Sequence, residues 1–402
     1  MDPLHRRRSE LFKREDSNPE DEFHVKYEPK EVLGRGLSST VRRCVSRETG
    51  REYAVKIIDK AQDEAIKESI DAEVHILSTL PRHPNIISLE DVFESPAFIF
   101  LVFELAQGGE LFDYLTKMVK LSEKKTRQIM YQLFSAVEHM HVHHVVHRDL
   151  KPENILLGQN LSLKISDFGF STTVAKGQQL SELLGTPGYL APEMLKRSVE
   201  PGAPGYGVEV DLWACGVIMY TLLVGFPPFW HRKQLVMLRN IMEGKYEFVS
   251  PEWDDISDNA KDMVRRLLVT NPQKRMTATE ALSHPFLQFQ AVDFKIFSAK
   301  RKFKAAVFCV WSCNALGKMH KTSQTLSLNA VGTVPYEQRY IRTLIDSCAF
   351  HIYGHWVKRG EEQNRAALFE TTPKMMHVAD NDSLKKFKVA CNTASNSRTL
   401  LA

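Results

Sequence analysis

Short apolar runs separated by turns occupy residues 27 to about 103, and helical spacing of apolar positions dominates from residue 108 onward. The runs at 53–58 and 97–103 are rich in β-branched and aromatic residues, which predicts strands. Apolar residues at helical spacing predict a helix over 63–80, and longer helices over 122–144 and 207–224. The pattern therefore predicts an α+β fold in which a small sheet-rich lobe precedes a larger helical lobe.

The two ends of the chain differ from this central part. Residues 1–26 are polar and charge-rich, which predicts a disordered N-terminal arm. We expect the sheet-rich lobe at 27–103 and the helical lobe at 108–290. Residues 291–402 hold basic, aromatic segments between polar stretches. For them we expect helices of a regulatory extension rather than a second enzyme.

Composition narrows the class of protein. A hydrophobic content of 43% and a charged content of 25% over 402 residues are ordinary for a soluble globular chain. The net charge of +4 does not favour nucleic acid as a partner. Six cysteines without a CxxC pair, and no visible signal peptide, fit a reducing cytoplasm. The longest apolar run, 212–230, is broken by Gly225 and Pro227-Pro228, which favours a buried helix over a membrane span.

The candidate chemistry is concentrated in His-Arg-Asp-Leu-Lys-Pro-Glu-Asn at 147–154 and Asp-Phe-Gly at 167–169. These stretches supply a base, a cation and two metal-binding positions, in the order that phosphoryl transfer from ATP to a hydroxyl requires. A glycine-rich turn and a strand lysine precede them, and Ala-Pro-Glu follows at 191–193. From about residue 27 to 290 the chain resembles the eukaryotic protein kinase family, which implies a bilobal kinase fold.

The resemblance assigns the nucleotide site. It implies that Lys56 holds the α- and β-phosphates of ATP and that Glu73 fixes this lysine in place. Gly34 and Gly36 would let backbone N–H groups approach the phosphates, although Ser39 stands where the family has a third glycine. The adenine would lie between apolar side chains and the backbone that joins the lobes: Leu33, Val41, Ala54, Leu156, Glu104 and Ala106.

The same resemblance assigns the catalytic groups. Asp149 would orient the substrate hydroxyl and accept its proton, and Lys151 would neutralise charge on the transferred phosphoryl group. Asn154 and Asp167 provide oxygen ligands suited to Mg²⁺. Thr186 would touch Asp149 and favour serine or threonine over tyrosine as the acceptor.

Arg148, next to the catalytic aspartate, suggests how activity is controlled. Kinases with this arginine usually need an anion on the activation segment, often a phosphorylated residue. The matching position is Glu182, so we expect activity without phosphorylation of that segment. A solvent-facing glutamate is the alternative. We also expect Glu193 to pair with Arg275 within the helical lobe.

Two further glutamates indicate a substrate with basic residues. In related kinases, the positions of Glu110 and Glu153 meet an arginine or lysine about three residues before the acceptor. Ribose contact or plain solvation is the alternative for either. The activation segment supplies the remaining residues that we assign to substrate binding. One is Glu182. The other three would form an apolar pocket for the residue after the acceptor: Leu183, Pro187 and Leu190.

Four stretches carry a closer resemblance. Segments 225–239, 250–255, 350–360 and 364–370 resemble the family of phosphorylase kinase catalytic γ subunits, and the last two lie outside the kinase domain. The resemblance implies phosphorylation of glycogen phosphorylase, promoting glycogen breakdown under Ca²⁺/calmodulin control, in a complex with α and β regulatory subunits and calmodulin. A free-standing Ca²⁺/calmodulin-regulated kinase is the alternative. A catalytically silent scaffold is disfavoured because Lys56, Asp149 and Asp167 are all present.

The extension is consistent with a calmodulin partner. An apolar stripe over 303–311, with Trp311 at its end, is flanked by lysines and arginine, and a second stripe follows over 341–352. Basic amphipathic helices with aromatic anchors suit calmodulin-type grooves. A membrane-surface helix, or an apolar face packed on the kinase lobe, would show the same pattern.

Overall fold

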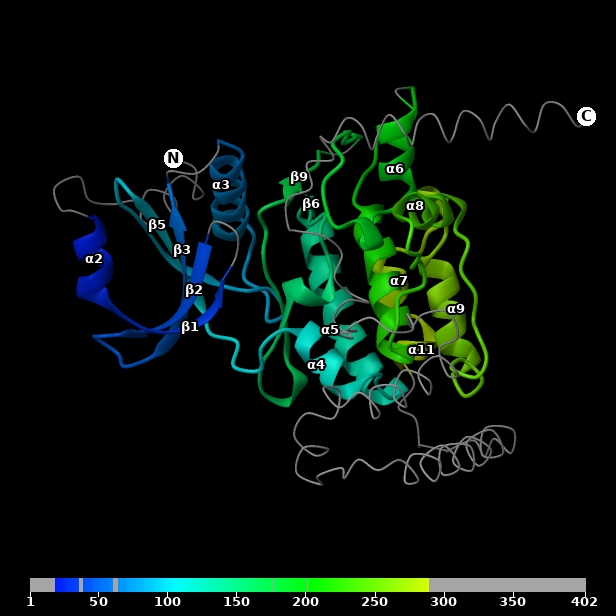
Figure 1. The fold of residues 1–402 in the computed structure, drawn as a ribbon, viewed down its shortest axis with the longest axis horizontal. Coiled ribbons are helices and arrows are strands. Elements are labelled where there is room, and N and C mark those ends of the chain that lie inside the picture. The colour runs from blue at the N-terminus through cyan, green and yellow to red at the C-terminus, as the bar shows by residue number, and fades with distance from the viewer. Residues whose placement is uncertain (1–18, 36–38, 61–63, 176, 201, 289–402) are drawn as a thin grey trace, which may run out of the picture. The chain divides into compact units, whose positions relative to one another are not determined.

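The computed structural model describes residues 19–35, 39–60, 64–175, 177–200 and 202–288 (Figure 1). The chain divides into two compact units. In one of them, only residues 248–255 are described. Within that segment, the rings of Phe248 and Trp253 lie 4.4 Å apart, and Ser250 Oγ donates to Asp254 Oδ2 at 2.9 Å. All helices and strands below belong to the other unit.

The first part of this unit is an antiparallel five-stranded sheet in the order β1-β2-β3-β5-β4. Strands β1, β2, β3 and β5 are labelled in Figure 1. Helix α3, which contains Glu73, lies between strands β3 and β4 in the sequence. The predicted strands at 53–58 and 97–103 and the predicted helix at 63–80 are thereby confirmed. The elements are β1 (Tyr27–Arg35), β2 (Ser39–Ser46), β3 (Glu52–Asp59), α3 (Glu64–Thr79), β4 (Leu89–Glu94) and β5 (Phe98–Glu104).

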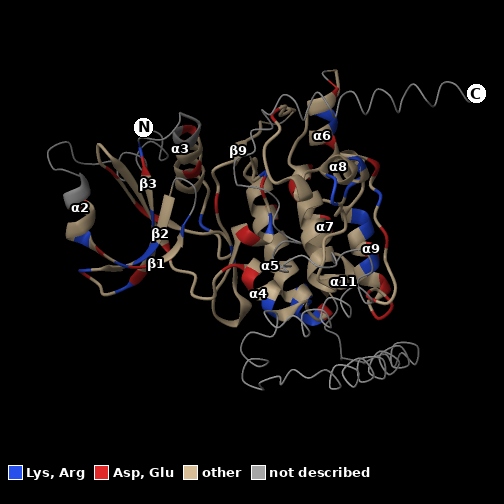
Figure 2. Ribbon diagram, viewed as in Figure 1, with Lys and Arg blue, Asp and Glu red and all other residues tan. Residues whose placement is uncertain are grey.

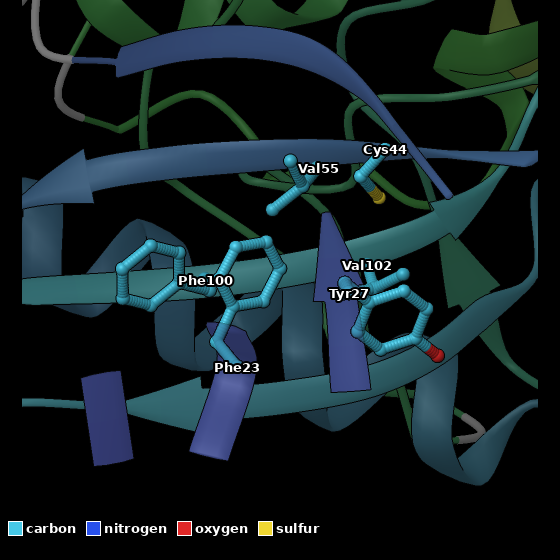
Figure 3. Packing of buried hydrophobic residues seen from close by; sticks show 6 residues of the cluster. All are labelled: Phe23, Tyr27, Cys44, Val55, Phe100 and Val102. Carbon is cyan, nitrogen blue, oxygen red and sulfur yellow. The ribbon is translucent and has the colours of Figure 1, made fainter. Parts of the chain in front are cut away.

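Helix α2 (Pro19–Lys26) corrects the prediction of a disordered arm over 1–26. Phe23 in this helix has no exposed surface, and its ring stacks on Phe100 at 4.6 Å between ring centroids. It completes an apolar cluster on one face of the sheet (Figure 3), whose members are Phe23, Tyr27, Cys44, Val55, Phe100 and Val102. One buried aromatic ring stabilises a segment whose composition is otherwise polar, so composition alone misses the helix. Residues 1–18 lie outside the described part.

The second part of the unit is helical, as the spacing predicted. Helix α7 is buried along nearly its whole length and is mostly uncharged (tan) in Figure 2, which explains the apolar run that begins at 212. No helix among the described residues is long and apolar enough to cross a membrane. The helices are α4 (Leu111–Met118), α5 (Glu123–Val142), α6 (Pro192–Val199), α7 (Glu209–Val224), α8 (Gln234–Glu243), α9 (Asp258–Leu267), α10 (Ala278–Leu282) and α11 (Pro285–Gln288).

Short strands in this part shape the loops that carry the candidate chemistry. They form two small antiparallel ribbons, one pairing β6 with β9 and the other pairing β7 with β8. Their bounds are β6 (Val145–Val146), β7 (Ile155–Leu157), β8 (Leu163–Ile165) and β9 (Thr172–Thr173). The stretch 147–154 therefore runs between two strands, and 167–169 follows a third after one intervening residue.

A buried ion pair holds α6 in the helical part. Arg275 donates from both terminal nitrogens to the two carboxylate oxygens of Glu193, at 2.7 and 2.8 Å. The same guanidinium lies over the ring of Trp213, 5.3 Å from its centroid. The pair predicted from the sequence is present, and its two-bond geometry suits arginine rather than lysine.

Replacing Phe23 with alanine tests the role of helix α2. We expect Phe23→Ala to lower the free energy of unfolding by about 3–5 kcal/mol, because a fully buried aromatic side chain is lost. Chemical denaturation of the full chain measures this change. Val25 lies in the same helix and is 75% exposed, so Val25→Ala is the matched control and should have little effect. Equal, small effects of both variants would show that α2 does not stabilise the sheet.

Candidate active site

Lys56 lies between two carboxylates at one end of the candidate site. Its ammonium is 2.6 Å from Glu73 Oε2 and 3.7 Å from Asp167 Oδ1. Burial alone lowers the pKa of Lys56, but the two carboxylates outweigh burial and hold that pKa above its ordinary value. The lysine therefore stays positively charged, as a phosphate-binding group must.

The residues assigned to adenine share faces with Lys56 or lie on the segment after β5. Val41 is the direct neighbour of Lys56 on β2, and Ala54 points to the same face because it is two residues away on one strand. Gly108 N donates to Leu157 O at 2.7 Å and Leu157 N to Gly109 O at 2.8 Å, which brings the joining segment against β7.

All but one of the other residues assigned to the nucleotide lie in the described part of the chain. Leu33 and Gly34 lie on β1, and no described residue lies within 4 Å of the place where a Cβ of Gly34 would be. Glu104 ends β5, and Leu156 is the middle residue of β7, partly exposed. Ala106 follows in the joining segment. Gly36 lies outside the described residues.

The catalytic loop brings four predicted residues into direct contact. Lys151 Nζ donates to Asp149 Oδ2 and to Thr186 Oγ1, both at 2.7 Å, and Thr186 Oγ1 donates to Asp149 Oδ1 at 2.7 Å. Asn154 Nδ2 donates to the backbone oxygen of Asp149 at 2.8 Å. All four side chains are buried, so the Asp149 carboxylate is held in one orientation by three neighbours.

The residues that would hold magnesium lie near one another. Ser166 N donates to Asn154 O at 2.9 Å, and Asp167 is the next residue in the chain. Asn154 uses its amide NH₂ on Asp149, so its carbonyl oxygen is the atom suited to a metal. Among the described residues, no group of three His, Cys, Asp or Glu could hold a metal by itself. This fits magnesium, which usually takes one or two protein ligands together with substrate phosphates.

Asp211 was missed by the sequence analysis although it positions the catalytic loop. Its buried carboxylate accepts hydrogen bonds from the backbone N–H groups of His147 and Arg148, both at 3.0 Å, and lies 2.9 Å from His141 Nε2. Burial alone raises the pKa of Asp211, but these donors lower it below its ordinary value. The sequence contained one sign of this role: an aspartate at the start of the apolar stretch that forms α7.

The predicted contact of Arg148 with the activation segment is present. Arg148 Nη1 lies 3.0 Å from Glu182 Oε2, and Arg148 Nε donates to Phe170 O. Tyr206 donates its hydroxyl hydrogen to the backbone oxygen of Glu182 at 2.6 Å. The arginine side chain is 7% exposed and the glutamate 67% exposed. The pair therefore lies at the surface, with the cation on its buried side.

Glu110 and Glu153, the two glutamates that the sequence assigned to substrate, lie near each other. A β-bridge places Glu110 opposite Leu156, three residues after Glu153. Burial raises the pKa of Glu153 to about 7, and the charges of Asp149 and Glu110 act in the same direction. Glu153 Oε2 is buried, and no described residue donates a hydrogen bond to it. In the activation segment, Pro187 and Leu190 are buried and Leu183 is partly exposed.

Comparison with known proteins agrees with this geometry. The family model described as "Protein kinase domain" matches residues 27–287. The human "Phosphorylase b kinase gamma catalytic chain, liver/testis isoform" is 52% identical over 375 residues, which cover 89% of this chain and 92% of the relative. The mouse protein of the same description is 50% identical over the same shares.

A second group of relatives is more distant. The rabbit (Oryctolagus cuniculus) "Calcium/calmodulin-dependent protein kinase type II subunit delta" is 42% identical over 302 residues, 71% of this chain and 55% of the relative. The fold and the site define a protein kinase, and the chain is a serine/threonine kinase. It belongs to the protein kinase family and, within it, to the phosphorylase b kinase gamma catalytic chains.

Proposed function

We propose that this chain is the ATP-dependent catalytic subunit of a phosphorylase kinase, which transfers a phosphoryl group to a serine of glycogen phosphorylase and so promotes glycogen breakdown. The observation that carries the proposal is the contact of Asp149 with Lys151, Thr186 and Asn154, together with Lys56 held near Asp167. The first group provides the hydrogen-bonding atoms that an acceptor hydroxyl would need, and the second suits a triphosphate. The names of the relatives supply the substrate.

The residues of the site account for the individual steps. Lys56 binds phosphate oxygens, since its charge is maintained by Glu73 and Asp167. Mg²⁺ held by Asn154 and Asp167 would neutralise charge on the phosphates. Asp149 accepts a hydrogen bond from the acceptor hydroxyl, then its proton. Lys151, 2.7 Å from Asp149 Oδ2, offers positive charge beside the same place.

The length of the match favours phosphorylase kinase over a free-standing calmodulin-regulated kinase. The gamma chains match over 375 residues and the type II delta kinase over 302. The longer match must extend well beyond the kinase domain, into the extension at 291–402, which lies outside the described residues. We assign calmodulin to that extension, with α and β regulatory subunits as further partners. We place the chain in the cytoplasm, in keeping with its unpaired buried thiols of Cys44 and Cys215.

A transfer assay tests the proposed substrate. The full chain should incorporate labelled phosphate from ATP into purified glycogen phosphorylase, with Ca²⁺/calmodulin increasing the rate. Asp149→Asn should lower kcat about a thousandfold, because the group that accepts the hydroxyl proton is lost. Asp113→Asn, an exposed aspartate on α4, is the matched control and should retain activity. Labelling of a generic basic peptide without labelling of phosphorylase would contradict the assigned substrate, and equal labelling by Asp149→Asn would contradict the role of that residue.

We propose that Glu182 replaces a phosphorylated residue, so that activity needs no prior phosphorylation. A carboxylate supplies one permanent negative charge where a phosphate supplies about two. Glu182→Ala should lower kcat about tenfold, since the charge-assisted contact with Arg148 is lost. Ser181→Ala, at the exposed neighbouring position, should leave kcat unchanged. Unchanged kcat in Glu182→Ala would show that the ion pair is incidental.

We propose that Glu153 and Glu110 bind a basic side chain of the substrate, which would supply a partner for the buried Glu153 Oε2. With a pKa of about 7, Glu153 is mostly neutral at pH 6 and mostly charged at pH 8. The KM for an arginine-containing peptide should therefore fall about fivefold to tenfold between pH 6 and pH 8. Glu153→Gln should flatten this dependence, and a peptide with leucine in place of arginine is the control. A pH dependence that persists in Glu153→Gln would exclude this residue as its source.

A further inference from the structure

The loop between α3 and β4 is bonded both to the sheet-rich part of the unit and to its helical part, and the candidate nucleotide residues come from both parts. The Asn85 side chain donates to Gln132 Oε1 on α5 at 3.1 Å and to Leu163 O on β8 at 2.9 Å. Ile165 N donates to Asn85 O, and Ile87 N to Ile165 O, both at 2.9 Å. Backbone and side-chain hydrogen bonds therefore fix residues 85–87 on the helical part of the unit.

Glu104, at the end of β5, is bound to this loop and to β8 through both carboxylate oxygens. Its Oε1 accepts from Ser88 N at 2.8 Å, and its Oε2 lies 2.9 Å from Lys164 Nζ. The backbone N–H of Glu104 donates to Ser88 O at 3.1 Å. Side chain and backbone of one residue are thus held at the point where the sheet-rich part ends.

Lys164 is the cation of this arrangement. Its ammonium also donates to Pro84 O at 2.9 Å, so it contacts both the loop and the end of β5. The Lys164 and Glu104 side chains are 23% and 21% exposed, so solvent screens this pair less than an open surface pair. On the β7–β8 ribbon, Lys164 lies directly opposite Leu156, which is assigned to adenine.

We propose that Lys164 is a positioning residue of the nucleotide site, which acts through the Glu104 carboxylate to hold the backbone of residues 104–106 in place for adenine. The inference rests on the proposed function, because that function puts adenine against Glu104, Ala106 and Leu156. The physical basis is preorganisation. If the side chain of Glu104 is fixed on two partners, the backbone beside it loses little further freedom when a nucleotide binds.

The test measures nucleotide binding and backbone protection in the full chain. In Lys164→Met, the Kd for ADP, measured by calorimetry, should rise about fivefold, since a charge-assisted contact that orders the site is lost. Without nucleotide, the amides of 104–108 should exchange hydrogen faster than in the wild type. The KM for a peptide substrate should not change. Lys164→Arg keeps the charge and should restore most of the binding.

Lys60 offers a matched control. Its ammonium also contacts one carboxylate, Glu94 Oε1 at 2.7 Å, and one backbone oxygen, Ser95 O at 3.1 Å, but it lies at the other end of β3 from the joining segment. Lys60→Met removes the same kind of contact and should leave the Kd for ADP unchanged. An equal increase in Kd for both variants would show a general loss of stability and would overturn the proposal.

The outcomes separate this inference from the proposed function. If the wild-type chain binds no ADP, the assignment of the nucleotide site in the proposed function is wrong. If the wild type binds ADP and Lys164→Met binds it equally, with unchanged exchange at 104–108, only the role of Lys164 is wrong. Should Lys164→Met fail to fold, Glu104→Gln keeps an oxygen for Ser88 N and removes the ion pair. It should raise the Kd for ADP by a similar factor, and unchanged binding would overturn the proposal.

Discussion

The arrangement of the active site depends on one buried carboxylate, that of Asp211. It accepts two consecutive backbone N–H groups of the catalytic loop, at His147 and Arg148, and thereby holds the loop at the residue before Asp149. Arg148 has a φ of 68°, a value that a non-glycine residue rarely adopts. The hydrogen bonds to Asp211 offset the cost of that conformation. Without them, the contacts of Asp149 with Lys151 and Thr186 would lose their fixed support.

Charge placement follows the same principle at each level of the site. Three cations of the unit each have a carboxylate partner: the partly exposed Lys56 has Glu73, the buried Lys151 has Asp149, and the buried Arg275 has Glu193. An isolated charge in such surroundings would be costly, and one partner with good geometry removes most of that cost. The carboxyl group of Glu153 differs from these paired carboxylates. Burial raises its pKa, and no described residue donates a hydrogen bond to its buried Oε2, so it is available to a cation from outside. An uncompensated acid on the substrate side fits a site for a basic side chain.

The sheet contributes mainly by alternation. On β3, Val55 points into the apolar cluster with Phe23 and Phe100 (Figure 3). Lys56, the next residue on the strand, therefore points to the opposite face of the sheet. The packing of helix α2 on one face therefore supports the strand that presents Lys56 on the other.

The sequence by itself determined the fold class, the order of the lobes and most residues of the candidate site. Local motifs carry those: apolar spacing sets helices and strands, and the 147–154 and 167–169 stretches contain their functional groups within a few residues. The tertiary structure alone decided the rest, because the partners are far apart in the chain. Asp211 reaches Arg148 across 63 positions, and Lys164 reaches Glu104 across about sixty. Helix α2 forms because Phe23 meets Phe100, a contact that no local pattern contains. Long-range contacts of this kind depend on how the elements pack, and spacing along the chain does not record that packing.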